Sequence, residues 1–136
     1  MSGLGKAAAI VSLIAGILEG LFGLFALLGM IMGGVMATGV LPNNGPDDPA
    51  VAGGMLLGIY GAFFLICLIG SVLHIGAGVQ MLREKVNRSF LWAAAVGSLL
   101  PMCTFYCALT SLPAGILLLV YLLTDQDPAA DPDILV

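Results

Sequence analysis

The chain has 136 residues, of which 60% are hydrophobic and 9% charged, with a mean hydropathy of +1.13 and a formal net charge of −4. A soluble domain carries about 25% charged residues, so these few charges cannot cover a water-facing surface. The length fits one small domain without a separate catalytic module, and the absence of a basic patch argues against binding nucleic acid.

The charged residues are placed as a membrane-spanning protein requires. Of the four Lys/Arg and eight Asp/Glu residues, all but Glu19 lie near the N-terminus, in two short segments or in the C-terminal tail. A helix needs about 20 apolar residues to cross a bilayer core, and a charge inside the membrane is costly. The uncharged runs therefore predict an integral membrane protein, with the lipid bilayer as its main surroundings.

The first helix is predicted over residues 6–38. Its apolar stretch is far longer than the ~7–15 residues of a signal-peptide core, so we expect a retained membrane span. Residues 41–49 contain three prolines and a glycine, which predicts a loop because proline cannot continue a helix. The second helix is predicted over residues 50–82.

The remaining apolar stretch, between Arg88 and Asp125, is tight for two membrane spans and long for one. We predict a short third helix over residues 86–100, a tight turn near Pro101, and a fourth helix over residues 104–123 with a kink at Pro113. If Pro101 lies within a helix instead, the turn moves to residues 110–113.

These elements predict an all-α fold. Residues 1–124 form one four-transmembrane-helix bundle of two antiparallel hairpins, and residues 125–136 form an acidic, Pro-rich tail that is too polar to fold alone. At ~1.5 Å per residue, the first two helices approach ~48 Å and the third reaches ~24 Å. The first hairpin is therefore longer than the second, and either tilts strongly or projects beyond it.

The Lys and Arg residues predict the orientation in the membrane. Lys6 and the loop at 83–88 are expected to face the cytoplasm, which puts the segment at 43–48 outside. Four spans then return the tail to the cytoplasm. We expect a bacterial inner-membrane protein with both termini cytoplasmic.

Glycines recur four residues apart on the first two predicted helices, in three pairs: Gly16 and Gly20, Gly29 and Gly33, and Gly54 and Gly58. Such small-xxx-small pairs let helix backbones approach closely in lipid. We expect these glycines to pack the helices of this bundle together. The alternative is a face for another subunit or for a second copy of the chain.

Four polar residues, one on each predicted helix, fall in one band near the middle of the membrane. Counted from the cytoplasmic charges, Glu19 lies ~20 Å deep, His74 ~14 Å, Ser98 ~15 Å and Ser111 ~21 Å. We predict a hydrogen bond or ion pair between Glu19 and His74 inside the bundle. A structural clamp, a proton relay and a cation site are all compatible with this pair, and Glu19 could instead contact a partner subunit.

The cysteines and the missing motifs argue against catalysis. Cys103 and Cys107 form a Cys-x-x-x-Cys pair, whereas four-helix membrane oxidoreductases that make disulfides use Cys-x-x-Cys with a second pair. Cys67 and these two are expected to pack as small hydrophobic residues. Nucleotide-binding and metalloprotease motifs are missing, and one His with three scattered Cys makes a zinc site or a Ser-His-Asp triad improbable. The sequence predicts no metal, no cofactor and no enzyme.

In the second half, Leu-Leu-Pro at 99–101 precedes Cys103 and Cys107, and Leu-Pro-Ala-Gly-Ile follows at 112–116. This order, within residues 70–123, resembles a loose group of small uncharacterised bacterial four-helix membrane proteins. The resemblance implies a four-helix fold and a turn at Pro101, and it implies no activity. The chain departs from the group in having fewer cysteines after Pro101, and Leu118 where an aromatic residue often stands.

Together these features predict a non-enzymatic accessory or scaffold subunit. It would pack within a larger membrane complex, with other membrane subunits as partners, or form a homo-oligomer. The alternative is a small proton- or cation-conducting transporter or channel that uses Glu19 and His74. A second alternative is a membrane thiol oxidoreductase that uses Cys103 and Cys107.

Overall fold

A computed structural model describes residues 3–38, 48–98 and 105–124 of the chain. These residues form four helices and no strand: α1 (Gly3–Ala37), α2 (Pro49–Leu82), α3 (Arg88–Gly97) and α4 (Phe105–Thr124). The predicted all-α fold is therefore confirmed for the described ranges. The turn predicted at Pro101 and the C-terminal tail lie outside them.

Helices α1 and α2 are the two long elements, with 35 and 34 residues. Both are long and apolar enough to cross a membrane. Helix α2 begins where the sequence provides a start signal, because the Asp48 side chain accepts a hydrogen bond from the Ala50 amide at 2.9 Å and Pro49 occupies the first turn. It ends at a tight turn in which Glu84 has a positive φ of 56°.

Helices α3 and α4 are shorter. Helix α3 has 10 residues, about 15 Å. It begins two residues later than predicted because Asn87 caps its start by accepting a hydrogen bond from the Phe90 amide at 3.3 Å, and it ends at Gly97. Helix α4 has 20 residues and runs through Pro113. The alternative turn at residues 110–113 is therefore wrong. Helix α3 alone is too short to cross a hydrocarbon core of ~30 Å.

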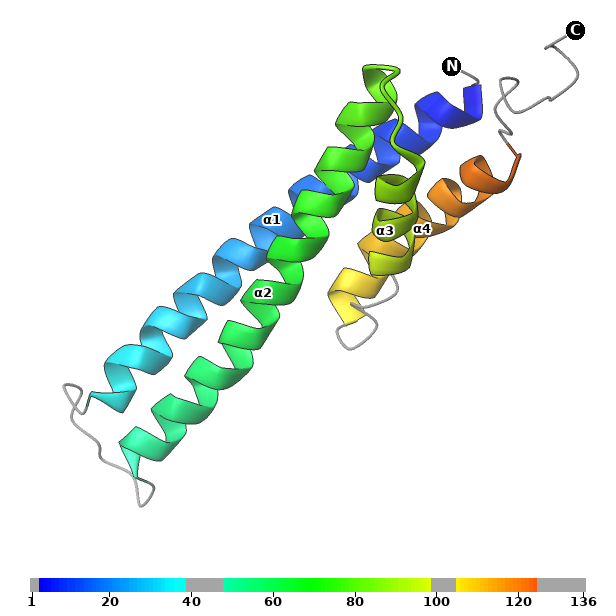
Figure 1. Cartoon of the computed structure of the whole chain (residues 1–136). Coiled ribbons are helices and arrows are strands. Elements are labelled where there is room, and N and C mark those ends of the chain that lie inside the picture. Colours follow the sequence, from blue (N-terminus) through cyan, green and yellow to red (C-terminus); the bar gives the residue numbers. More distant parts are fainter. Residues whose placement is uncertain (1–2, 39–47, 99–104, 125–136) are drawn as a thin grey trace, which may run out of the picture.

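The helices form two antiparallel pairs (Figure 1). The pair α3–α4 packs against one end of the longer pair α1–α2. The start of α1, the end of α2, the start of α3 and the end of α4 all lie at that same end. Lys6 and the loop at 83–88 therefore lie at the same end of the bundle. The Lys and Arg residues predicted that these two segments face the same side of the membrane, and that side stays a prediction.

The second pair covers only part of the first. Ser111 of α4 contacts Glu19 of α1, and α4 begins about 9 Å from Ser111 along its axis, close to the level of residue 25. Because Gly33 packs against residues 53–57 of α2, the same level on α2 is near residue 63. We call residues 25–37 and 49–63 the distal hairpin, which extends about 18–21 Å beyond α4. The remaining described residues form the four-helix half.

The core of the four-helix half combines small and large apolar side chains. Met81, Leu91 and Leu118 are fully buried beside the alanines of α1, α2 and α3. Close approach of α1 and α2 depends on glycine, because a Cβ atom at Gly16 would lie 2.9 Å from the Ile75 amide nitrogen. In lipid, such close packing and interhelical hydrogen bonds hold helices together.

The predicted packing glycines divide into two groups. A Cβ atom would contact α2 at four of them: Gly16, Gly20, Gly29 and Gly33. At Gly33 it would lie 2.8 Å from the Leu57 amide nitrogen, and at Gly29 2.6 Å from the Tyr60 ring. At Gly54 and Gly58 it would meet no described residue within 4 Å. For those two residues, packing within this bundle is wrong, and a face for another subunit stays a prediction.

Candidate functional site

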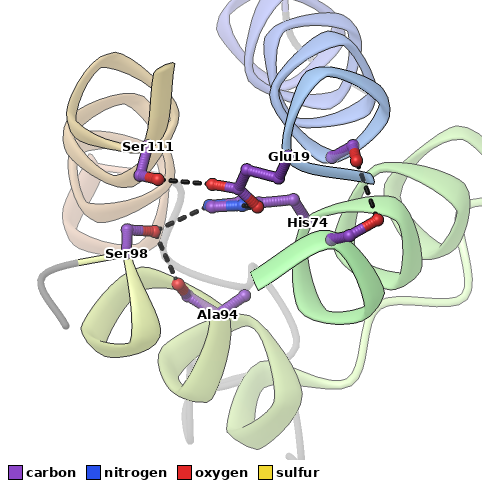
Figure 2. A network of polar contacts seen from close by, with 7 residues as sticks. Glu19, His74, Ala94, Ser98 and Ser111 are labelled. Atoms are coloured by element: carbon purple, nitrogen blue, oxygen red, sulfur yellow. Dashed lines mark hydrogen bonds and ion pairs between the residues drawn. The ribbon is translucent and has the colours of Figure 1, made fainter. Parts of the chain in front are cut away.

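The four residues of the predicted polar band meet in one network between the four helices (Figure 2). His74 Nδ1 lies 2.9 Å from Glu19 Oε2, and His74 Nε2 lies 2.8 Å from Ser98 Oγ. The Ser111 hydroxyl donates to Glu19 Oε1. Each of the four side chains is at most 1% exposed. The predicted contact between Glu19 and His74 is present and joins α1 to α2, and the network as a whole connects all four helices.

Two glycines that the sequence reasoning missed make room for this network. A Cβ atom at Gly70 would lie 2.7 Å from Glu19 Oε2, so the carboxyl group can rest against α2 one turn before His74. A Cβ atom at Gly115 would lie 2.6 Å from Ser98 Cβ, so α3 and α4 could not approach as closely. Both glycines lie four residues from a network residue, His74 and Ser111 respectively, which is the signal that could have identified them.

The hydrogen-bond donors of the network can be assigned from Ser98. Its hydroxyl donates to the Ala94 carbonyl oxygen at 2.7 Å. A hydroxyl group has one hydrogen, so Ser98 Oγ can only accept from His74. His74 Nε2 therefore carries a hydrogen and donates it to Ser98.

This assignment leaves one proton between Glu19 and His74. Either a carboxylic acid donates to the Nδ1 lone pair of a neutral imidazole, or an imidazolium donates from Nδ1 to a carboxylate. The two arrangements differ by one proton transfer across the 2.9 Å contact, and both have zero net charge. The network thus avoids the large cost of a buried net charge.

The same geometry limits what the network can bind. Both carboxyl oxygens of Glu19 and both ring nitrogens of His74 already have partners. Within the described ranges, no three His, Cys, Asp or Glu side chains are grouped to hold a metal ion. The contacts therefore suit a clamp between helices and a shared proton, and none of them favours a cation site.

A second polar contact, which the sequence reasoning missed, ties α1 to α2. The hydroxyl of Ser71 donates to the Gly16 carbonyl oxygen at 2.8 Å. Ser71 lies three residues before His74 and so shares its helix face, a spacing that could have identified it. This bond involves neither α3 nor α4, so it can hold the long pair together independently of the network.

The other polar candidates lie apart from the network. Ser12 is fully buried, and its hydroxyl has no hydrogen-bond partner in the described part of the chain. Cys67 is buried and faces α1, because a Cβ atom at Gly23 would lie 3.5 Å from its own Cβ. Cys103 and the side chain of Cys107 lie outside the description, so the role of this pair stays a prediction.

No protein-family model, curated protein or solved structure matches this chain. The resemblance of residues 70–123 to small bacterial four-helix membrane proteins stays a prediction. The function is therefore argued from the network and from the surfaces of the helices.

Proposed function

We propose that this protein is a non-enzymatic integral membrane protein, a scaffold or accessory subunit that packs within a larger membrane complex or self-assembles. The observation that carries the proposal is the surface of the distal hairpin. Its two helical segments contain no charged residue, and their large apolar side chains point outward. Phe25, Met55 and Ile59 are 69%, 66% and 67% exposed.

The length of this surface supports a protein partner. Helix α2 spans about 50 Å without a charged residue, whereas a hydrocarbon core is ~30 Å thick. A tilt of about 40°, the upper end of the usual range, still leaves roughly 38 Å along the membrane normal. Lipid tails cannot cover all of the exposed apolar surface, and a partner surface would cover the remainder.

Gly54 and Gly58 fit the same role. A glycine inside a helix costs about 0.5–1 kcal/mol relative to alanine, and these two have no close neighbour among the residues that the structure describes. Glycines four residues apart let a second helix approach the backbone. A helix of another protein chain could therefore pack against α2 at this position.

The polar network supports a structural role for the four-helix half. Its side chains are buried and bonded to one another, so a substrate could not reach them without separation of the helices. We further propose that α3 and α4 form the second hairpin of a four-span bundle. The end with Lys6 and the loop at 83–88 would face the cytoplasm of a bacterial inner membrane, with both termini on that side.

The test is the native mass of the protein after gentle extraction from its own membranes, with its companions identified. We expect a large assembly or a defined oligomer. Gly58→Leu should reduce the assembled fraction because it fills the open space on α2, whereas Ala93→Leu, on the exposed face of α3, is the matched control. A single 13.9 kDa chain would contradict the proposal.

The rival function, proton conduction, is favoured by one specific observation, the proton shared between Glu19 and His74. A transporter of this kind would lose proton flux in Glu19→Gln, which keeps the shape of the side chain but cannot ionise. Flux measured in vesicles that contain the purified protein distinguishes the two functions. The scaffold proposal predicts no flux above empty vesicles for either form.

A further inference from the structure

All four Lys and Arg residues of the chain lie at one end of the bundle. They are Lys6 on α1, Arg83 and Lys85 in the turn after α2, and Arg88 at the start of α3, and all four are exposed. We call these four residues the basic end. Glu84 is the only acidic residue that the structure describes there. Four cations against one carboxylate leave an excess of three positive charges within the described ranges.

Two of these cations, on neighbouring helices, lie at nearly the same level along the helix axes. A Cβ atom at Gly78 of α2 would lie 2.8 Å from the Ala9 carbonyl oxygen of α1, so these two residues are in contact. Lys6 lies about 5 Å beyond this contact along α1, and Arg83 lies about 8 Å beyond it along α2. Their levels therefore differ by about 3 Å.

Arg88 is held close to this level by α4. Its Nη2 donates to the Leu122 carbonyl oxygen at 3.2 Å, in the last turn of α4, where carbonyl groups have no partner within the helix. Leu122 lies about 17 Å from Ser111 along α4, and Lys6 lies about 20 Å from Glu19 along α1. Because Ser111 contacts Glu19, the two cations again lie about 3 Å apart in level. A guanidinium group has five N–H donors, so four of those of Arg88 remain for a ligand.

The other three cations have no counter-charge in the described part of the chain. No ion pair joins Lys6, Arg83 or Lys85 to another described residue. Like charges gathered at one level repel each other, and an anion bound among them would be attracted by all of them. The basic end therefore favours an anionic ligand.

The apolar surface beside the cations indicates what kind of anion fits. Trp92 lies one turn from Arg88 on the same face of α3 and is 41% exposed, and Leu82 and Val86 are 49% and 37% exposed. Tryptophan is enriched at the level of lipid headgroups. A phospholipid presents a phosphate and then acyl chains in this same order. A soluble acidic protein has no acyl chain to cover these side chains.

We propose that the basic end binds the headgroup of an anionic phospholipid, with its four cations as the phosphate-binding groups and Trp92 against the acyl chains. Arginine binds phosphate through parallel N–H bonds, and lysine binds it as a point charge. Each Lys or Arg near an anionic bilayer surface strengthens binding by about fivefold. The inference requires a chain that lies in a membrane. It rests neither on a protein partner nor on the side of the membrane that this end faces.

The single tryptophan of the chain allows a local measurement at this site. The full-length protein is reconstituted in vesicles of phosphatidylcholine and phosphatidylglycerol, with bromine atoms on the acyl chains of one lipid or of the other. Bromine quenches tryptophan fluorescence at short range, so the quenching reports the lipid composition beside Trp92. We expect phosphatidylglycerol to be enriched there over its fraction in the vesicle.

Variants test whether the cations cause this preference. Arg83→Gln and Lys85→Gln should each lower it by up to about fivefold, whereas Arg83→Lys keeps the charge and should retain most of it. Asp48→Asn is the matched control, because it removes a charge at the far end of α2 and asparagine can still cap the helix. It should leave the preference unchanged. Trp92→Phe combined with Ile59→Trp moves the fluorophore to the distal hairpin, where we expect no preference.

Equal quenching by the two brominated lipids in the wild type would overturn the proposal, and so would an unchanged preference in both Arg83→Gln and Lys85→Gln. A preference that appears only when the four aspartates of residues 125–136 are replaced by asparagine would assign the basic end to the acidic tail and would also overturn it. A monomeric native mass would contradict the scaffold function alone, since a monomer has the same basic end.

Discussion

The two halves of this molecule join their helices in different ways. In the four-helix half, Met81, Leu91, Leu118 and a polar network are buried between the helices, and other large apolar side chains are exposed. In the distal hairpin, the buried residues are Ala26, Gly33 and Gly53, and no large side chain is fully buried, although the Tyr60 ring packs against Gly29. A Cβ atom at Gly53 would collide with the Ala37 amide nitrogen, so backbone contact holds this part together. In lipid, both solutions are stable because neither depends on hiding apolar surface.

The difference suggests that the four-helix half and the distal hairpin have different roles. The four-helix half encloses the polar network, and in the membrane arrangement proposed above its apolar exterior would face lipid. The distal hairpin has no such groups to enclose, and its surface remains free to contact another protein. Variants that affect one half and spare the other can test this division.

The largest effect is expected for Glu19→Ala in the four-helix half. It removes two hydrogen bonds and leaves His74 and Ser111 buried without their partner, which costs about 3–5 kcal/mol for a broken buried pair. Glu19→Gln should cost much less because it keeps both bonds. Unfolding by steric trapping in bicelles measures both values, and equal values for the two variants would show that the network does not stabilise the fold.

A smaller effect is expected for Gly70→Ala. The new Cβ atom would lie 2.7 Å from Glu19 Oε2, and displacing the carboxyl group should cost about 1–3 kcal/mol. Gly58→Ala is the matched control in the distal hairpin, where the space is open, and should be neutral or stabilise the helix by up to about 1 kcal/mol. The comparison uses the same unfolding assay, and a reversed order would refute the assignment of the two faces.

The smallest effect is expected for Ser71→Ala. Its bond to the Gly16 carbonyl is a neutral interhelical hydrogen bond, and such bonds contribute about 0.6 kcal/mol on average in a membrane protein. The loss should appear in the unfolding of the whole protein, measured in the same assay. A cost as large as that of Glu19→Ala would contradict this ranking.

Sequence reasoning identified the helices and the members of the network, and it did so for physical reasons. Glu19 and His74 stand out because ionisable residues are rare inside apolar helices, and axial counting brought Ser98 and Ser111 to a similar depth. It missed Gly70 and Gly115 because their role depends on which face of the helix meets a neighbour. It also misjudged Gly54 and Gly58, whose spacing equals that of the inward glycines.

The length of the third helix was less predictable than that of the fourth, which was predicted over residues 104–123 and is observed over residues 105–124. Helix α3 ends at Gly97, and Ser98, the residue after it, donates its hydroxyl to the Ala94 carbonyl and lies against His74. The Pro113 position did not end α4, although proline usually breaks a helix in water. The sequence predicted a helix that continues through Pro113, and neighbouring helices in membrane-type packing can satisfy the freed backbone groups.

The central claim is that the distal hairpin contacts another protein whereas the four-helix half contacts lipid. Site-specific photo-crosslinking in native membranes tests it most directly, with the crosslinker placed at Met55 of the distal hairpin and at Ile116 of α4, which are 66% and 56% exposed. The account predicts a discrete protein adduct from Met55 and lipid adducts alone from Ile116. Lipid adducts alone from both positions would contradict it.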